Sequence, residues 1–140
     1  MWQTGLAMVL RAFLIWLLLL ATAILNGLFR VSVLNPRLGP DAGHLVSTIL
    51  LCAEVLAIAW LTIRWIGPGA PRHAIAIGGL WLLLTVAFEF GFGRTVGQRT
   101  WSEMLADYNV LQGRIWIAAL ITIAGAPLWA GRLRRLWRLD

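Results

Sequence analysis

Four long apolar stretches run along the chain, separated by shorter segments rich in glycine, proline and charged residues. A helix needs about 20 predominantly apolar residues to cross the hydrocarbon core of a bilayer, and each stretch reaches that length. The pattern predicts an all-α integral membrane protein, a single transmembrane domain over residues 1–140 that forms a four-transmembrane-helix, up-and-down bundle. The predicted spans are residues 5–28, 44–66, 73–93 and 112–131.

Short connections set the relative direction of these spans. Residues 33–41 and 67–71 contain the prolines and glycines that favour turns, and helices joined so closely run antiparallel. The third connection is longer, and Thr100 and Glu103 within it have the spacing of a capping box, in which a hydroxyl and a carboxylate cap the first amides of a helix. Apolar residues follow at helical spacing, so we expect a short amphipathic helix at the membrane surface over residues 100–110.

The first stretch also has the order of features found in a cleavable signal peptide, with Arg11 before an apolar run and small residues at 21–23. Two observations favour a retained helix instead. The apolar character continues past the small residues through Leu25, and Asn26 and Arg30 then share one helical face. We therefore expect the first span to stay in the protein.

Composition separates this chain from soluble proteins. Of its 140 residues, 60% are hydrophobic, nine are Trp and only 13% are charged, as in integral membrane proteins. The spans leave no room for a soluble catalytic domain.

All twelve basic residues are Arg, and the net charge of +6 fits guanidinium groups among lipid phosphates better than a nucleic-acid partner. We expect the phospholipid bilayer as a partner and no nucleic acid. The single cysteine, Cys52, cannot form an intrachain disulfide.

The arginines are divided unevenly between the two sides of the predicted membrane. An even number of spans places both termini and the second connection on one side, with seven arginines against five on the other. Basic residues favour the cytoplasmic side, so we predict that both termini are cytoplasmic. The seven are Arg11, Arg64, Arg72, Arg132, Arg134, Arg135 and Arg138, and the five are Arg30, Arg37, Arg94, Arg99 and Arg114.

Polar residues recur on the spans in the half opposite the termini. Asn26 and Arg30 are four residues apart and share a face of the first helix, and Ser47 and Glu54 are seven apart in the second. Because all four spans contribute, we predict a polar pocket that opens to the periplasm and binds a small ligand or ion. Its predicted lining is Asn26, Arg30, His44, Ser47, Glu54, Glu89, Arg94, Asp107, Asn109 and Arg114.

Two carboxyl groups in this set have different surroundings. Glu54 lies roughly 15 Å along the helix from His44 at about 1.5 Å per residue, close to the midplane of a core about 30 Å thick. An ionised carboxylate at that depth costs several kcal/mol, so Glu54 should be protonated, paired or in contact with water. Its role is either helix packing or the handling of a proton or cation. Glu89 lies at the level of three arginines, which can lock helices together by ion pairing or bind an anionic ligand or lipid headgroup.

The candidate residues do not form a metal or hydrolase signature. The chain has no Glu-x-x-His repeat, no H-E-x-x-H and no Cys/His cluster. His44 and His73 fall on opposite sides of the predicted membrane, which excludes haem ligation by both in one chain. No G-x-S-x-G is present either. We expect neither a metal nor a cofactor, and we favour a protein that is not an enzyme.

The FEFGFGR segment at 88–94 is followed by Asp-Tyr-Asn at 107–109 and Gly-Arg-Ile-Trp at 113–116, and it is preceded by an Asn-Gly pair at Asn26 and by Pro-Arg-Leu-Gly at 36–39. This combination resembles uncharacterised small bacterial inner-membrane proteins of about this length. The resemblance covers nearly the whole chain and implies a four-span fold in a bacterial inner membrane. It implies no reaction, because those proteins carry no assigned activity.

Three functions fit this pattern. The leading one is a multi-pass membrane protein whose pocket binds or passes a small ion, proton or anionic group, with Glu54 and Glu89 as titrating groups. The alternative is a non-catalytic accessory or structural subunit of a membrane complex or homo-oligomer, docked through small residues that include Gly78 and Gly125. The third is an intramembrane enzyme that acts on a lipid or quinone headgroup.

Overall fold

A computed structural model describes residues 2–95, 100, 102 and 116–137. Within these residues all regular structure is helical, which confirms the predicted fold class at the level of an all-helical chain. The elements are α1 (Trp2–Phe29), the π-helix η1 (Arg30–Leu34), α2 (Asn35–Leu38), α3 (Pro40–Ile66), α4 (Pro71–Thr95) and α6 (Trp116–Leu133).

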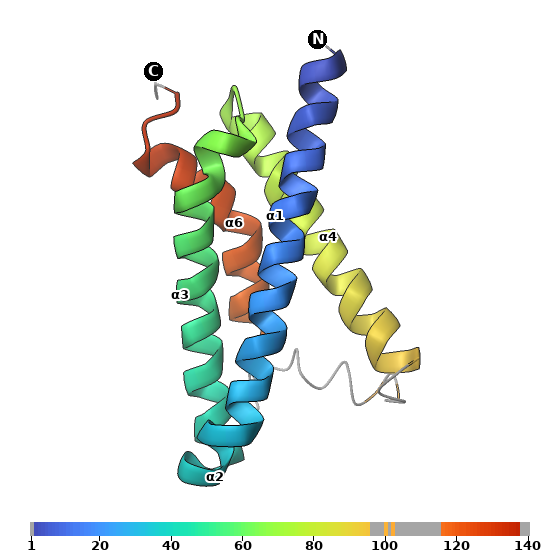
Figure 1. The fold of residues 1–140 in the computed structure, drawn as a ribbon, viewed down its shortest axis with the longest axis vertical. Helices are drawn as coiled ribbons and strands as arrows, with labels where there is room; N and C mark the ends of the chain where they lie inside the picture. The colour runs from blue at the N-terminus through green and yellow to red at the C-terminus, as the bar shows by residue number, and fades with distance from the viewer. Residues whose placement is uncertain (1, 96–99, 101, 103–115, 138–140) are drawn as a thin grey trace.

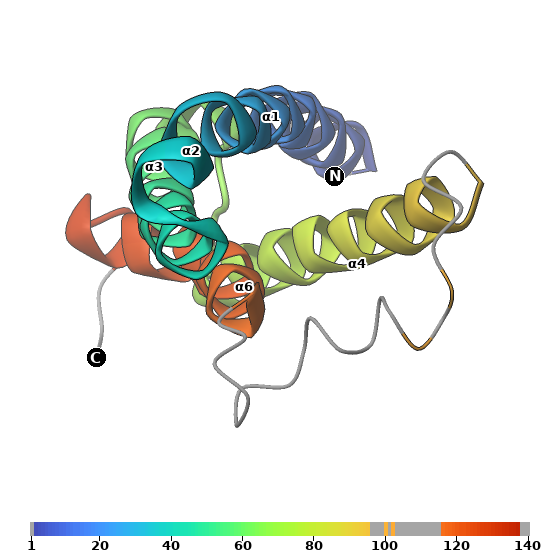
Figure 2. The same ribbon diagram turned by 90° about the horizontal axis from the view of Figure 1, so that it is seen from below.

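The four long helices follow one another around an arc. α6 packs against both α3 and α4, and α1 packs mainly on α3. Seen from below, α1 and α4 stand at the two ends of the arc, and α4 diverges from the other helices toward its C-terminal end (Figure 2). Successive long helices run in opposite directions, so α1 begins and α6 ends at the same end of the molecule (Figure 1). We call this the terminal end, and we call the opposite end, where η1 and α2 join α1 to α3, the distal end.

The connection between α1 and α3 differs from the turn predicted at residues 33–41. The chain stays helical through η1 and α2, and only Gly39 interrupts it before α3 begins. The amide of Asn35 donates to the carbonyl of Arg30, the wider hydrogen bond of a π-helix. Pro36 lies in the first turn of α2, where its missing N–H removes no helical bond. The prediction of a turn was therefore wrong, because Pro36 and Pro40 lie in the first turns of α2 and α3 and begin these helices instead of ending the one before.

Three helical stretches are long and apolar enough to cross a membrane. Ile117–Leu133 is a shorter apolar helix, and the first residues of the predicted fourth span lie outside the described part of the chain. The predicted interfacial helix also lies outside it, apart from Thr100 and Ser102. The three long stretches are Gly5–Leu38, Pro40–Ile66 and Pro71–Thr95.

The outward faces of these helices carry large apolar side chains. Leu61, Leu83 and Ile121, on three different helices, are 66%, 68% and 67% exposed. Such a surface is costly in water and suits hydrocarbon. Threonine hydroxyls on the helices donate to carbonyls of their own helix, as Thr62 does to Ile58 at 2.6 Å, which satisfies them without water. These features are those of a helical membrane protein.

The core includes the region where α4 crosses α1 and α6, toward the terminal end. Trp81 is fully buried, and its indole Nε1 donates to the carbonyl oxygen of Ala12 in α1 at 2.8 Å. On the same helix, Gly78 lets α4 approach α6 so closely that a Cβ atom at this position would collide with the carbonyl oxygen of Ala124. Gly78 is thus explained by packing inside the bundle. Past this crossing, α4 leaves α1 toward the distal end (Figure 1).

Candidate functional site: a cleft between two helix pairs

Asn26 and Ser47 form a reciprocal contact between α1 and α3. The side-chain amide Nδ2 of Asn26 donates to the Ser47 carbonyl oxygen at 3.1 Å, and the Ser47 hydroxyl donates to Asn26 Oδ1 at 2.5 Å. Both residues are buried, at 8% and 3% exposure. Because each side chain already has a buried partner, this pair fixes one helix against the other.

A second polar contact joins the start of η1 to the first part of α3. Arg30 Nη1 lies 3.1 Å from His44 Nδ1. A guanidinium has donors only, so in this contact Arg30 donates and His44 Nδ1 accepts. The contact thus connects the start of η1 to α3.

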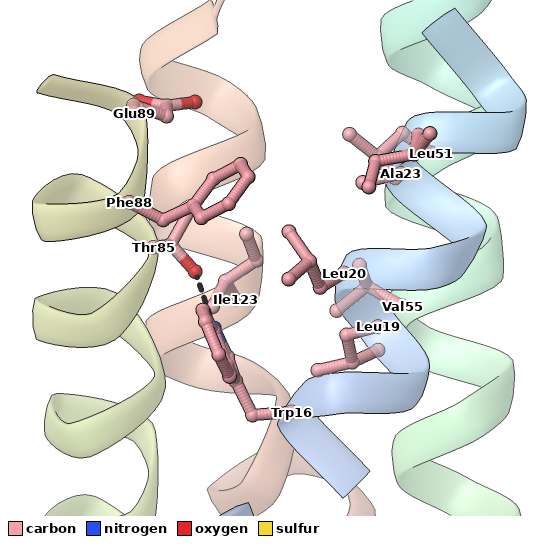
Figure 3. Close-up of a pocket in the computed structure, with 11 residues that line it drawn as sticks. Trp16, Leu19, Leu20, Ala23, Leu51, Val55, Thr85, Phe88, Glu89 and Ile123 are labelled. Atoms are coloured by element: carbon pink, nitrogen blue, oxygen red, sulfur yellow. Dashed lines mark hydrogen bonds between the residues drawn. The ribbon is translucent and has the colours of Figure 1, made fainter. Parts of the chain in front are cut away.

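A cleft of about 160 Å³ lies between α1 and α3 on one side and α4 and α6 on the other. Figure 3 shows side chains from the two sides facing each other across it. Apart from Thr85 and Glu89, the lining side chains are apolar, so the cleft differs in character from the predicted polar pocket. The lining residues are Trp16, Leu19, Leu20, Ala23, Ile24, Leu51, Val55, Thr85, Phe88, Glu89 and Ile123.

The two polar residues of the cleft both belong to α4. Trp16 Nε1 donates to the Thr85 hydroxyl at 3.0 Å, which joins α1 to α4 at one end of the cleft (Figure 3). Phe88 packs edge-on against Trp16, with 6.5 Å between ring centroids, and stacks on Phe92. Glu89 lies at the other end of the cleft from Trp16 (Figure 3), and its side chain is half-buried. The cleft therefore has an aromatic wall and one carboxyl group at its end.

The predicted site residues do not all line one pocket in the described part of the chain. The two polar pairs lie toward the distal ends of α1 and α3, and neither pair lines the cleft. Glu89 does line it, whereas Arg94 is exposed in the last turn of α4. Asp107, Asn109 and Arg114 lie outside the described residues.

Glu54 does not line the cleft, although its neighbours Leu51 and Val55 do. Its side chain is half-buried, and Oε2 is buried with no hydrogen-bond partner in the described part of the chain. A buried carboxyl oxygen without a partner is costly. The described helices therefore do not supply the contact that would satisfy Glu54.

Sequence reasoning missed the aromatic part of the cleft. Trp16 and Phe88 stand within strongly apolar runs, where an aromatic residue is equally expected to face lipid. The sequence does contain one signal for an inward-facing Trp16, because its indole N–H needs a hydrogen-bond acceptor inside a membrane span. Thr85 supplies that acceptor, but only the folded structure identifies it.

No protein-family model, curated protein or solved structure matches this chain. Among the residues that the structure describes, no three His, Cys, Asp or Glu side chains gather as ligands of a metal ion would. The distinctive chemistry is that of the cleft, with apolar walls and a carboxyl group at one end. A ligand with a hydrocarbon part and a polar head matches this combination.

Proposed function

We propose that this chain is a multi-pass membrane protein that binds one small amphipathic molecule in the cleft. The hydrocarbon part of the ligand lies between the apolar walls, and its polar group, a hydrogen-bond donor or a cation, lies at Glu89. The observation that carries the proposal is the lining, which is apolar except for Thr85 and Glu89. Close packing against side chains from four helices supplies the affinity, and the carboxyl group sets the orientation.

A bare ion is a poorer fit to the cleft. Between these walls an ion loses its water shell, and apolar side chains offer no oxygen or nitrogen atoms in exchange. Only Thr85 and Glu89 bring side-chain oxygens to the lining, which are too few to replace the water shell of an ion. We therefore propose a molecule that carries its own hydrocarbon in place of the small ion, proton or anionic group expected from the sequence.

The proposal places the protein in a bacterial inner membrane, with four spans, an interfacial helix at residues 100–110 and both termini in the cytoplasm. Two features support the part of this proposal that puts both termini on one side of the membrane: α6 is apolar and runs antiparallel to α4, and α1 begins at the end where α6 finishes (Figure 1). A cysteine introduced next to either terminus in a Cys52→Ala background tests it. A membrane-impermeant maleimide should label this cysteine only after the inner membrane is broken. Labelling in cells whose inner membrane is intact would reverse the orientation.

A photoreactive ligand tests the class of molecule that the cleft binds. The protein in lipid nanodiscs is irradiated with a long-chain alkyl amine that carries a diazirine, and the labelled residues are located by mass spectrometry. We expect labels on cleft residues and weaker labelling by the matched alkyl carboxylate, because Glu89 favours a cation. Equal labelling by the two compounds would remove the proposed role of Glu89.

Two alanines of α1 provide matched variants for the cleft itself. Ala23 lines the cleft, whereas Ala21 is exposed on the outside of the same helix. Ala23→Phe fills the cleft and should lower labelling about tenfold, equivalent to about 1.4 kcal/mol of binding, while Ala21→Phe should leave it unchanged. Glu89→Gln should reduce the preference for the amine and keep the labelled positions. Equal labelling of the Ala23→Phe and Ala21→Phe variants would refute binding in the cleft.

An accessory subunit of a membrane complex is the second candidate, and Glu54 favours it. A donor from a neighbouring membrane protein or a second copy would satisfy Glu54 Oε2, which has no partner among the described residues. Glu54→Gln retains hydrogen bonding and should be tolerated, whereas Glu54→Leu should release the partner from a complex isolated in mild detergent. Gly78 packs internally, but a Cβ atom at Gly125 would meet nothing within 4 Å, so Gly125→Leu tests whether a partner docks at this small residue. Complexes that survive both leucine variants would exclude this candidate.

A further inference from the structure

Six arginines gather at the terminal end of the molecule. No carboxylate of the described residues lies with them, because Asp41 is at the distal end, Glu54 is in the middle of α3 and Glu89 is in the second half of α4. The positive charge at the terminal end is therefore not offset by the described side chains. The six are Arg11, Arg64, Arg72, Arg132, Arg134 and Arg135.

Two tryptophans hold two of these arginines in place. Arg134 Nη1 donates to the carbonyl oxygen of Trp60 at 2.7 Å, and the guanidinium lies over the Trp60 ring, 4.5 Å from its centroid. Arg11 has the same relation to Trp65, with a 3.0 Å bond to the carbonyl oxygen and 5.5 Å to the ring centroid. A guanidinium has five N–H donors, so stacking on a ring leaves its edges available for further acceptors.

Arg64 brings another guanidinium to the same place. Its Nη2 lies 3.4 Å from the backbone carbonyl oxygen of Arg134, to which it donates. Carbonyl oxygens are neutral, so the bonds of Arg64 and Arg134 order the two side chains without cancelling their charge. The guanidinium groups of Arg64 and Arg134 thus form a positively charged site between the C-terminal ends of α3 and α6.

Arg135 adds a third guanidinium at a position where the backbone favours glycine. Its φ is +53°, and the amide of Leu136 donates to the Gly131 carbonyl at 3.0 Å while the amide of Arg135 donates to the Arg132 carbonyl at 3.1 Å. This is the Schellman arrangement of a helix end, in which the left-handed residue is usually glycine. The Arg135 side chain is exposed, and its presence here is not explained by the backbone.

We propose that the C-terminal ends of α3 and α6 bind the phosphate of an anionic phospholipid, with Arg64, Arg134 and Arg135 as its contacts. The planar edges of guanidinium groups match phosphate oxygens with pairs of hydrogen bonds. Trp60 is partly exposed beside them, and tryptophan favours the headgroup level of a membrane. The arginines therefore lie at the depth of lipid phosphates, and basic pockets between helix ends are a known form of lipid recognition.

The surface next to the arginines identifies a lipid as the occupant. Leu61 and Leu133 lie close to Arg64 and Arg134 along their helices and are 66% and 55% exposed. A phosphate bound here thus lies beside an apolar surface that acyl chains cover, whereas a soluble anion would leave that surface bare. The positive charge that the described side chains leave uncancelled favours phosphatidylglycerol over phosphatidylcholine, whose ammonium group it repels.

Lipid preference is measured by native mass spectrometry on the full chain in detergent, after addition of phosphatidylglycerol or phosphatidylcholine with identical acyl chains. We expect phosphatidylglycerol to bind about tenfold more tightly, the order of one additional charge-assisted contact, and the preference to weaken as salt is raised. Arg135→Gly should lower the preference severalfold while the protein remains at least as stable, because glycine fits the left-handed cap. Arg64→Gln should also lower the preference for phosphatidylglycerol.

Arg37→Gln is the matched control, since it removes the same charge from an exposed position in α2 at the distal end. It should leave the lipid preference unchanged. Arg135→Gly and Arg64→Gln variants that bind phosphatidylglycerol like the Arg37→Gln variant would overturn the proposal. Displacement of the lipid by millimolar inorganic phosphate would also overturn it, because the site would then belong to a soluble anion. This site does not depend on the cleft, so either proposal can fail while the other holds.

Discussion

The close approach of α4 to α6 at Gly78 makes a sharp test of the helix arrangement. A Cβ atom added there would collide with the carbonyl oxygen of Ala124 and would also crowd its carbonyl carbon. These are backbone atoms of α6, which cannot rotate away as the end of a side chain can. We expect Gly78→Ala to lower the free energy of unfolding by about 1–3 kcal/mol, the usual cost of overpacking, which changes the unfolding equilibrium roughly 5- to 150-fold.

Gly79 provides a control of the same chemistry at the adjacent residue. A Cβ atom there would meet nothing within 4 Å, and alanine favours a helix over glycine by up to about 1 kcal/mol. Gly79→Ala should therefore be neutral or stabilising. The two variants should differ by about 1–4 kcal/mol, with Gly78→Ala the less stable of the two.

Reversible unfolding in mixed detergent micelles, followed by circular dichroism, measures both variants against the parent protein. The comparison is made between single methyl additions at neighbouring positions, so differences in detergent binding or expression cancel. If the Gly78→Ala variant unfolds at the same denaturant concentration as the Gly79→Ala variant, then α4 and α6 do not approach each other at Gly78. The described position of α4, and with it the cleft, would be refuted.

Three further predictions concern stability. Asn26→Ala should lower the free energy of unfolding by about 0.5–2 kcal/mol by removing the partner of the buried Ser47 hydroxyl, and the double variant with Ser47→Ala should lose less than the sum of the two single changes. Additive losses in the double-mutant cycle would mean that the two side chains do not interact. Gly39→Ala should cost about 1–3 kcal/mol, because alanine must adopt the φ of 90° and ψ of 159° found at Gly39, whereas Gly27→Ala in α1 has open space around it and should be tolerated. Equal unfolding midpoints for these two glycine variants would contradict the described break between α2 and α3. Trp81→Phe removes the indole donor to α1 and part of the buried ring, and should cost about 1–3 kcal/mol, so an unchanged free energy of unfolding would contradict burial at the crossing.

The long helices could be predicted from the sequence because the thickness of a bilayer sets the length of an apolar run. The predicted second span, residues 44–66, ends at the same residue as α3, since Gly67 follows in a left-handed conformation with φ of 78° that ends the helix. Its start was less predictable. α3 begins earlier, at Pro40, because a proline that reads as a turn signal fits the first turn of a helix equally well.

The candidate site could be predicted only in part. Helical spacing identified the faces of the first two spans that carry polar residues, and the short connection between them brings Asn26 to Ser47. Glu89 lines the cleft and Glu54 does not, although both stand on helices that contribute to its lining. Periodicity identifies which face of a helix is polar, but it contains no crossing angle, and so it placed in one pocket residues that the fold keeps apart.

α6 is the last of the described helices to be synthesised, and it packs against both α3 and α4. Before α6 enters the membrane, α1 and α3 can pair through their own contacts. At that stage α4 has few helix contacts besides its crossing with α1 at Trp81. The order of translation therefore leaves completion of the bundle until α6 has left the ribosome. A chain that stops short of residue 116 therefore lacks α6, the helix that packs against both α3 and α4.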